Sequence, residues 1–462
     1  MKTVFKISWA YALLIVVWSC ANEGLEDGNP LGTSDGYSLK SYNNGIIKSY
    51  SNETVLKWNE LVGTYIDEKI PQPLEAKIYA MVTLTMHDAL NNVVPKYETY
   101  ALDNTLVDAS AISKKNIHAI ADAAVSQATR DIFAALFPPG TSGANSLLNT
   151  ILSQIEDSES KSKGIDIGKA AAAAMLEKRQ GDFPLVFSTF TGTGIAPGDY
   201  QANFMPWMLP NPPIWPANAV YAPNLGDLTP FGINTGNQFR DEGSYPISSQ
   251  AYIDDYNEVK ALGCTNCPER TPEQTEIGTF WIENTASMMN RIARTLIQQD
   301  NLNGWEAARL IALVEMSQID GFIASFEGKR YFNFWRPITA VRAGDNDGNP
   351  ETIGDPTWTP THTTPPTPEY PSTHSYCGGA GAEVLKLFFG TDTKPFTATS
   401  PYYLAGVERN ITSFSQLARE NAESRIYIGY HFRHAIEVGE RQGKQLGNYV
   451  FKNNLRELKK VL

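Results

Sequence analysis

Apolar residues recur every three or four positions along most of this chain, which is the spacing of one buried face of an α-helix. One such face runs from Ile78 to Val93, and a second runs from Ile117 to Leu136 and is ended by Pro138-Pro139-Gly140. Few segments alternate between apolar and polar residues as strands do, so we predict an all-α fold, a helical bundle. The same helical spacing continues in 165–176, 305–326, 383–389, 411–425 and 431–455.

Composition limits the partners that such a bundle can have. The 462 residues are 42% hydrophobic, which is enough for a large core, and the net charge is -12 with 19% charged residues. A nucleic-acid surface or a polybasic membrane contact is therefore not expected. We divide the chain into a signal peptide (1–19), a flexible tether (20–52), an N-terminal helical half (53–181), a Pro- and Trp-rich connecting segment (182–270) and a C-terminal helical half (271–462), with both halves in one integrated domain.

The N-terminus has the pattern of an export signal. Lys2 and Lys6 precede an apolar run, Ala10 to Trp18, that is too short to span a bilayer. The following Cys20 fits a bacterial lipoprotein signal, in which the cysteine becomes the lipidated first residue; the alternative is ordinary secretion with Cys20 nearby by chance. In both cases we expect the mature protein outside the cytoplasm. With the lipoprotein signal it would lie in the periplasm or at the cell surface and touch the membrane only through a lipid anchor at Cys20.

The connecting segment leaves two questions open. A long irregular segment in a compact protein is usually either a functional cover over a site or a surface linker. Cys264 and Cys267 lie in this segment as Cys-Thr-Asn-Cys. In an oxidising compartment we expect a local disulfide, whereas half of a zinc site is the weaker alternative because the chain has no second cysteine pair.

The stretch Tyr370-Pro371-Ser372-Thr373-His374 predicts the start of a helix near His374. Pro371 disfavours a helical conformation in the residue before it, and Ser372 is a good N-cap. A helix N-terminus carries unpaired N–H donors and partial positive charge, so we expect an anion there, with His374 as a proton donor or acceptor. Taken alone, the pattern also fits a capped structural helix with a surface histidine.

Two other segments add cations and a second histidine. Lys329 and Arg336 lie seven residues apart and hence close to one helical face. Arg425 and His431 lie six apart, on different faces of an unbroken helix, but Gly429 permits a break that lets both point at one site. Combined with the helix start described above, these side chains predict a cradle for an oxyanion such as phosphate or vanadate.

The patterns Lys-x6-Arg-Pro, Pro-Ser-x-His and Ser-Arg-x5-His, in this order, resemble the signature of the superfamily that joins vanadium-dependent haloperoxidases, type 2 phosphatidic acid phosphatases and bacterial acid phosphatases. The motif-bearing region covers about 271–450, and within it 334–342 and 368–372 are more similar to the haloperoxidase branch. The helical first half, which the smaller phosphatases lack, is also similar to bacterial haloperoxidases. The resemblance implies a helical bundle of the vanadium haloperoxidase and acid phosphatase type, with an extra N-terminal half and a long Pro-rich connecting segment.

The resemblance also implies a role for each residue of the cradle. His431 would ligate vanadium, His374 would take a proton from hydrogen peroxide, and Lys329 would polarise the bound peroxide for attack by halide. These three are therefore the expected catalytic residues. The implied reaction oxidises halide with hydrogen peroxide to hypohalous acid, with vanadate as the cofactor. The expected vanadate-binding groups are Lys329, Arg336, Ser372, the backbone N–H of Thr373, Arg425 and His431.

Three positions depart from the family pattern. Thr373 replaces the usual glycine, which keeps the N–H but adds bulk and limits φ. Ala435 stands where the family often has an acidic residue, so the expected orienting partner of His431 is His434 or a backbone carbonyl. Thr367 stands where haloperoxidases commonly carry an aromatic residue or a histidine near the halide, so the preferred halide stays open.

Haloperoxidase is the leading hypothesis, and two other functions fit the same cradle. In a vanadate-inhibitable acid phosphatase or other phosphoesterase, His431 would attack phosphorus and His374 would protonate the leaving oxygen. In a non-catalytic surface lipoprotein, which Thr373 and Ala435 favour, the pocket would bind an anion without turnover. The sequence leaves open whether a small organic acceptor takes the oxidised halogen and whether the chain forms a homo-oligomer.

Overall fold

The structure is a computed structural model that describes residues 45–189, 196–202, 207–208, 214–215, 219–240 and 243–458. The predicted signal peptide, Cys20 and most of the predicted tether lie outside the described residues. The prediction of a helical fold is confirmed. The helices are α2 (Glu53–Ile66), α3 (Gln72–Val93), α4 (Ile117–Leu136), α5 (Thr141–Ser153), α6 (Glu159–Lys178), α7 (Gln250–Leu262), α8 (Pro272–Phe280), α9 (Thr285–Gln299), α10 (Gly304–Phe332), α11 (Pro337–Ala343), α12 (Thr373–Phe389), α13 (Phe414–Tyr427) and α14 (Arg433–Asn453).

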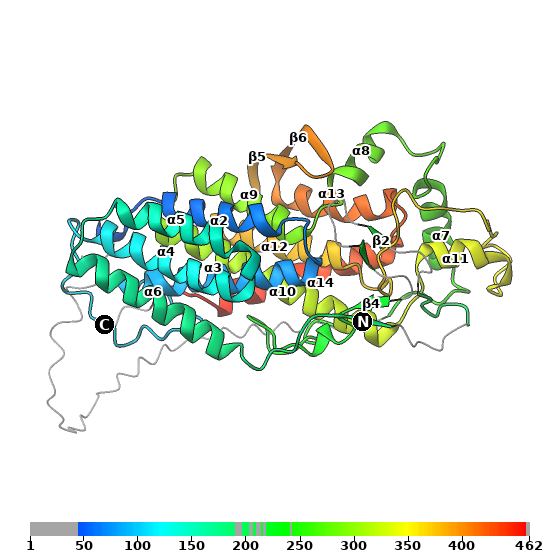
Figure 1. Cartoon of the computed structure of the whole chain (residues 1–462). Coiled ribbons are helices and arrows are strands. Elements are labelled where there is room, and N and C mark those ends of the chain that lie inside the picture. Colours follow the sequence, from blue (N-terminus) through cyan, green and yellow to red (C-terminus); the bar gives the residue numbers. More distant parts are fainter. Residues whose placement is uncertain are drawn as a thin grey trace, which may run out of the picture.

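The strands of the described residues form three two-stranded antiparallel sheets, β1 with β4, β2 with β3, and β5 with β6. The longest of these pairs, β5 with β6, forms a hairpin that projects above α9 and α13 in Figure 1. The strand bounds are β1 (Phe187–Thr189), β2 (Trp207–Met208), β3 (Ile214–Trp215), β4 (Ala219–Tyr221), β5 (Thr393–Ser400) and β6 (Leu404–Ser413).

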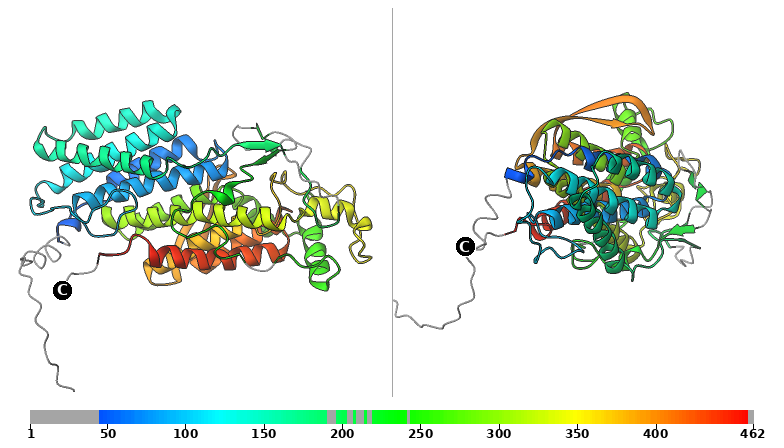
Figure 2. Two further views of the ribbon diagram at one scale, coloured as in Figure 1. Left: turned by 90° about the horizontal axis from the view of Figure 1, so that it is seen from below. Right: turned by 60° about the vertical axis from the view of Figure 1, so that its left-hand side comes forward.

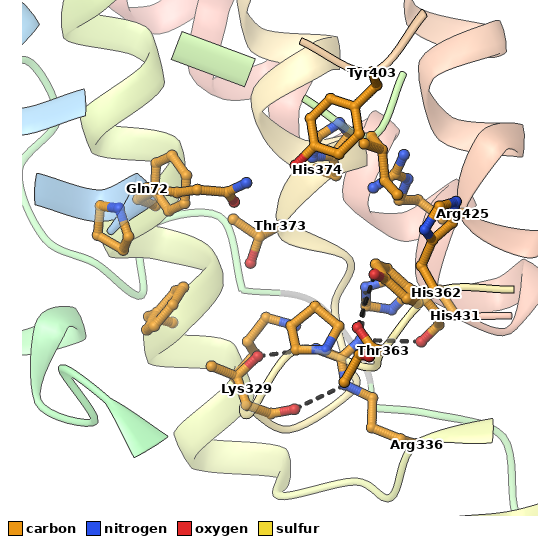
Figure 3. Close-up of a pocket in the computed structure, with 17 residues that line it drawn as sticks. Gln72, Lys329, Arg336, His362, Thr363, Thr373, His374, Tyr403, Arg425 and His431 are labelled. Atoms are coloured by element: carbon orange, nitrogen blue, oxygen red, sulfur yellow. Dashed lines mark hydrogen bonds between the residues drawn. The ribbon is translucent and has the colours of Figure 1, made fainter. Parts of the chain in front are cut away.

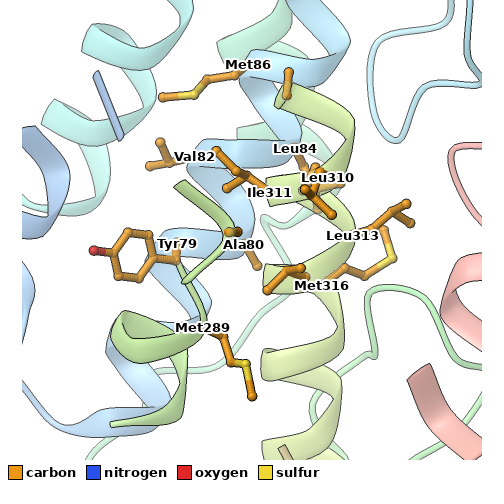
Figure 4. Packing of buried hydrophobic residues seen from close by; sticks show 14 of the residues in the cluster. Tyr79, Ala80, Val82, Leu84, Met86, Met289, Leu310, Ile311, Leu313 and Met316 are labelled. Carbon is orange, nitrogen blue, oxygen red and sulfur yellow. The ribbon is translucent and has the colours of Figure 1, made fainter. Parts of the chain in front are cut away.

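Helix α10 runs through the middle of the molecule and joins its two halves (Figure 1). A capping box fixes its start, because the Asn303 side chain accepts the N–H of Glu306 while the Glu306 side chain accepts the N–H of Asn303. Its N-terminal half packs on α3 and its C-terminal half on α12. Large apolar side chains buried there contribute about 1.5–3 kcal/mol each. Figure 4 shows Tyr79, Ala80, Val82, Leu84 and Met86 of α3 against Leu310, Ile311, Leu313 and Met316 of α10.

Helices α2 to α6 gather at one end of the molecule (Figure 2). Helices α12 and α14 lie beside α10, and α13 packs on α12. Close packing of α14 on α12 brings two parts of the predicted site together. Gly439, Gly443 and Gly447 are spaced one turn apart on α14, and a Cβ at Gly439 would lie only 2.7 Å from the carbonyl oxygen of Ser372. The N–H of Ser372 also donates to the carbonyl of Ala435 at 3.1 Å. The start of α12 is thereby joined to the chain just after His431.

Two boundaries differ from the prediction. The end of the predicted tether is packed into the core: Ile46, Ile47 and Tyr50 are buried, and the Tyr50 hydroxyl donates to Asp122 at 2.8 Å. Residues 411–413, predicted as the start of a helix, belong to strand β6. These short segments carry too few residues for a helical period to be distinguished from a strand or a loop.

The described part of the connecting segment contains helix α7 and a disulfide. The bond between Cys264 and Cys267 confirms the predicted disulfide and excludes the alternative of half a zinc site, since both sulfur atoms are used. Within the described ranges, no residue of 182–270 borders the cavity described below. Helix α7 was not predicted, because its 13 residues carry polar and charged side chains on most of their surface.

Candidate active site

A cavity of about 310 Å³ lies where the C-terminal half of α10, the start of α12 and the loop between α13 and α14 meet (Figure 3). Ser372 is fully buried beside this cavity but does not border it. The structure thus brings the three predicted segments to one place. The predicted residues that border the cavity are Lys329, Arg336, Thr373, His374, Arg425 and His431.

Lys329 and Arg336 reach the cavity from different elements, so the prediction that they share one helical face is wrong. Helix α10 ends because Asn333 takes the left-handed conformation, with φ of 48°. Helix α11 then begins with Pro337, directly after Arg336. The chain therefore turns between the two cations, and the turn, rather than a shared helical face, points both into the cavity.

One loop holds both of these cations in place. Lys329 Nζ donates to the carbonyl oxygens of Pro368 and Glu369, each at 2.8 Å. Arg336 donates through Nε to the Thr367 carbonyl at 2.8 Å and through Nη2 to the Thr367 hydroxyl at 2.9 Å. Thr367, the position that left the halide preference open, therefore positions Arg336.

The start of α12 has the predicted form. Ser372 is the N-cap, and its Oγ accepts the N–H of Ser375 at 3.4 Å and the Ser375 hydroxyl at 2.9 Å. Thr373 is the first helical residue, so its N–H has no intrahelical acceptor. The Thr373 hydroxyl accepts a hydrogen bond from Ser325 at 2.9 Å. The bulk that Thr373 adds relative to glycine is thus accommodated in ordinary helical backbone.

His374 keeps one ring nitrogen available as a base. Its Nε2 lies 2.6 Å from the carbonyl oxygen of Trp281, to which Arg425 Nη2 also donates at 2.5 Å. A carbonyl can only accept, so Nε2 carries the proton and Nδ1 is unprotonated. Burial, followed by the positive charge of Arg425, holds the pKa of His374 well below its usual range. The ring is therefore neutral and can accept a proton at Nδ1.

The predicted break between Arg425 and His431 is confirmed. Helix α13 ends at Tyr427, and Gly429 has φ of 77°, in the region that favours glycine. A Cβ at Gly429 would lie 2.6 Å from the carbonyl oxygen of Gly263. The turn at Gly429 lets both side chains border the same cavity.

His431 is oriented by Glu369, a partner that was not predicted. His431 Nδ1 lies 2.8 Å from Glu369 Oε1, which also accepts the N–H of Phe432 at 3.0 Å. On the other side of the ring, Arg336 Nη1 lies 3.0 Å from Nε2. Because a guanidinium group can only donate, Nε2 carries a lone pair and Nδ1 carries the proton. The nitrogen that can ligate a metal is thereby fixed next to Arg336.

The orienting partners expected from the sequence do not serve this purpose. His434 Nε2 lies 3.2 Å from the carbonyl oxygen of Gly243, and its ring stacks on Tyr245 and Tyr370 instead. Glu369 lies 62 positions before His431 in a loop without periodicity, so sequence spacing could not pair them. Within the sequence, the position of Glu369 shortly before the predicted helix start was the only sign that it could lie near the site.

Positive charge dominates the cavity. Lys329, Arg336 and Arg425 are each at most 3% exposed. Burial lowers the pKa of all three, to about 10 for Arg425, and the charge of Arg336 lowers the pKa of the other two further. Burial raises the pKa of Glu369 to about 8, and its Oε2 has no hydrogen-bond partner among the described residues. This carboxyl group therefore offsets only part of the buried positive charge, and a bound anion would offset the rest.

The donors fit a tetrahedral or trigonal-bipyramidal oxyanion. Two guanidinium groups supply planar arrays of N–H donors, and the Lys329 ammonium supplies a point charge. The neutral imidazole of His431 supplies a lone pair, which an oxyanion with an open coordination position can accept. One imidazole and several hydrogen-bond donors thus fit a metal centre that is already surrounded by oxygen atoms. Within the described ranges, no group of three or more His, Cys, Asp or Glu side chains could by itself hold a metal ion.

Other walls of the cavity were not predicted. His362 and Thr363 come from the loop before α12, Tyr403 from the turn between β5 and β6, and Gln72 and Pro73 from the start of α3. Burial lowers the pKa of His362 to about 4, so this third imidazole is also neutral. These positions lie at turns and element ends, where neither periodicity nor a motif marks them.

Comparison of the sequence with known proteins finds relatives in one family. A model of the VCPO second helical-bundle domain matches residues 309–460, which include most of α10, all of α11 to α14 and all the predicted site residues. The chain is 25% identical over 476 aligned positions to a vanadium chloroperoxidase from Curvularia inaequalis, and the alignment covers 83% of this chain and 78% of that protein.

Solved structures with the same fold span nearly the whole chain. The crystal structure of the first bacterial vanadium-dependent iodoperoxidase has a TM-score of 0.70 at 22% identity, covering 89% of this chain and 99% of that one. The holo-type structure of a bacterial vanadium-dependent chloroperoxidase has a TM-score of 0.63 at 16% identity, covering 83% and 92%. Its apo-type structure has a TM-score of 0.64 at the same identity. The N-terminal helices are thus included in the structural similarity.

Proposed function

Since the chain belongs to the family of the vanadium-dependent haloperoxidases, we propose that it oxidises halide with hydrogen peroxide to hypohalous acid at a vanadate held in this cavity. One observation carries the proposal. The neutral His431, tied to Glu369 through Nδ1, presents its Nε2 lone pair beside three buried cations. This pairing of one metal-ligating nitrogen with a positively charged oxyanion site suits a vanadate centre.

The residues present fit vanadate, which supplies a Lewis acid of constant oxidation state when bound. His431 would ligate through Nε2, and Arg336 would exchange its hydrogen bond to that nitrogen for one to an oxyanion oxygen. Lys329 and Arg425 would donate from side chains that the loop carbonyls and Trp281 already orient. The Thr373 N–H would add a donor from the start of α12. The Ser372 hydroxyl lies beside the cavity without bordering it, so it would have to turn toward the oxyanion to add another donor.

His374 would handle the proton of the incoming peroxide. Its Nδ1 is the unprotonated nitrogen, and the Trp281 carbonyl would stabilise the opposite N–H as the ring gains charge. Lys329 would then direct positive charge toward the peroxide oxygen that halide attacks. Its pKa is lowered by burial and by Arg336, and two carbonyl oxygens at 2.8 Å favour its charged form.

A phosphoesterase remains the second candidate, because Glu369 supplies the orienting carboxyl group that a nucleophilic histidine needs. In that reaction His431 Nε2 would attack phosphorus and His374 would protonate the leaving oxygen.

Paired assays on one preparation separate these functions. The protein without its first 20 residues would be loaded with orthovanadate and assayed for iodide and bromide oxidation with hydrogen peroxide. The vanadate-free form would be assayed for phosphomonoester hydrolysis. We expect halide oxidation that requires vanadate. Hydrolysis alone would support the phosphoesterase, and no activity in either assay would support an anion-binding lipoprotein.

We predict that Ser372→Ala weakens vanadate binding about tenfold or more without abolishing it. One hydrogen bond to a charged group is lost out of several. Loss of the N-cap should also lower the free energy of unfolding by about 1 kcal/mol. Isothermal titration with orthovanadate measures the affinity. The control is Ser375→Ala, which removes the hydroxyl that donates to Ser372 Oγ; equal affinities in both variants would contradict a donor role for Ser372.

We predict that Thr373→Gly leaves vanadate affinity unchanged and lowers the free energy of unfolding by about 1 kcal/mol. The N–H at this position is retained, whereas the hydrogen bond from Ser325 is lost. Chemical denaturation of the vanadate-free protein and vanadate titration measure the two quantities. Tighter vanadate binding by the glycine variant would show that the threonine side chain distorts the oxyanion site.

We further propose that the mature protein is exported and anchored by lipid at Cys20. The Lys2-to-Cys20 pattern supports this location. The Cys264–Cys267 disulfide is also in keeping with an oxidising compartment. Among the described residues, no helix has both the length and the hydropathy needed to cross a bilayer. Metabolic labelling with a radioactive fatty acid, with Cys20→Ser as control, tests the anchor.

A further inference from the structure

Tyr403 connects the cavity to a buried carboxyl group that plays no part in the mechanism described above. Its ring lies near His374 at the cavity wall (Figure 3). A hydrogen bond of 3.1 Å joins its hydroxyl to Glu68 Oε2. Glu68 follows α2, is 1% exposed and does not border the cavity. Tyr403 therefore contacts both the cavity and the buried carboxyl group.

Glu68 is held firmly in this position. Its Oε1 accepts the N–H of Asn284 at 2.6 Å, and its own N–H donates to Glu75 Oε2 at 3.1 Å. Its φ is 55°, in the left-handed region that an L-residue with a long side chain rarely adopts. A strained backbone that tertiary contacts maintain is often found where a side chain has a specific task.

The groups that face Glu68 act on its protonation in both directions. The neighbouring carboxyl groups of Asp67, of Glu75 on α3 and of Glu283 before α9 favour the protonated form. Hydrogen bonds from the Tyr403 hydroxyl and the Asn284 N–H favour the ionised form, as does any positive charge from Arg291 on α9. Arg291 is paired with Glu283 by two hydrogen bonds of 2.8 and 2.5 Å, so its charge is already matched. Burial, followed by the charge of Glu283, raises the pKa of Glu68 to about 8. Glu68 therefore holds a proton at neutral pH and loses it as the pH rises through this value.

We propose that Glu68 and Tyr403 form a proton relay that delivers to the cavity the proton consumed by halide oxidation. This inference rests on the proposed function. The reaction of hydrogen peroxide with halide and one proton gives hypohalous acid and water. His374 only moves a proton that the peroxide brought with it, so one further proton must come from elsewhere in each turnover.

The relay step balances as a pair of proton transfers. Protonated Glu68 donates its Oε2 proton to the Tyr403 oxygen, while the Tyr403 hydroxyl proton passes to the oxygen that leaves as water. The Glu68 O–H bond and the original Tyr403 O–H bond break, and a new Tyr403 O–H bond and a bond to the leaving oxygen form. Glu68 is left as a carboxylate and regains a proton from water through the same hydroxyl before the next turnover.

The test compares two variants with a matched control from the same turn. Tyr403→Phe keeps the aromatic ring and removes the hydroxyl. Glu68→Gln keeps the shape of the side chain and replaces the ionisable carboxyl group with an amide. Tyr402→Phe is the control, because the Tyr402 hydroxyl lies 3.5 Å from the buried Asp67 but its side chain does not border the cavity. We expect both relay variants to lower kcat at pH 7 by about 100-fold, as for loss of a general acid. The fall in kcat as pH rises through about 8 should disappear in both.

A second measurement reads the carboxyl group directly in the vanadate-free protein. Infrared difference spectra between pH 6 and pH 10 should contain a protonated-carboxyl C=O band that is lost in Glu68→Gln and kept in Tyr402→Phe. An unchanged pH profile in both relay variants of an active enzyme would overturn the relay alone. A difference spectrum unchanged by Glu68→Gln would also overturn it. An inactive wild-type enzyme would overturn the proposed function and the relay together.

Discussion

Replacing His431 with alanine is expected to reduce vanadate-dependent halide oxidation to background. The His431 Nε2 presents its lone pair beside the Arg336 guanidinium and can ligate vanadium there, whereas the cations can hold the oxyanion only electrostatically. Loss of a ligand's orienting partner alone weakens metal binding about 10- to 100-fold, so loss of the ligand itself should weaken vanadate affinity by more. Isothermal titration with orthovanadate and an iodide oxidation assay measure the two effects.

The matched control for this variant is His434→Ala. His434 is also buried and lies three residues along the chain, but its ring stacks on Tyr245 and Tyr370 and does not border the cavity. The His434→Ala variant should therefore retain vanadate binding, with a lower free energy of unfolding than the wild type. If both alanine variants lost vanadate affinity equally, the effect would reflect damage to the start of α14 and not loss of a ligand.

Replacing Glu369 with glutamine is expected to weaken vanadate binding about 10- to 100-fold. Glu369 Oε1 accepts the Nδ1 proton of His431 at 2.8 Å, which fixes the ring. In its ionised form Glu369 also makes Nε2 more electron-rich, whereas glutamine keeps an acceptor but cannot ionise. Glu369→Ala should have a larger effect, because it also leaves the buried N–H of Phe432 without an acceptor, at a cost of about 1–3 kcal/mol.

Asp255→Asn is the matched control for the Glu369 variants. The Asp255 carboxylate accepts the N–H of His434 at 2.9 Å, so it also contacts the start of α14, but it does not border the cavity. Vanadate affinity should be the same in this variant as in the wild type. An unchanged vanadate affinity in Glu369→Gln would mean that orienting the His431 ring is sufficient for vanadate binding and that the negative charge of Glu369 adds nothing.

The sequence was most informative where local chemistry decides the structure. The N-cap at Ser372 and the turn at Gly429 were both predicted and are both present, because each depends on residues within about one helical turn. The sequence also predicted that the three motifs meet at one site, and the structure brings all three to one cavity. The prediction that Lys329 and Arg336 share one helical face is wrong, because Asn333 takes the left-handed conformation and ends α10 between them.

What could not be predicted depends on contacts between distant residues. The pairing of Glu369 with His431 joins a loop to a turn across 62 positions, and no local pattern records it. The contact between Tyr403 and Glu68 joins a hairpin turn to the end of α2 across 335 positions. Helix packing places both pairs together, and packing follows from the shapes of many side chains at once.

Titration of the vanadate-free protein with orthovanadate, followed by iodide oxidation at each step, tests whether vanadate in this cavity is the catalytic cofactor. We predict that activity is absent without vanadate, rises in proportion to added vanadate and reaches a plateau at one vanadate per chain. Inorganic phosphate should compete, because it would bind the same buried cations. Halide oxidation without vanadate, or a saturated protein that oxidises no halide, would show that this cavity is not a vanadate-dependent haloperoxidase site.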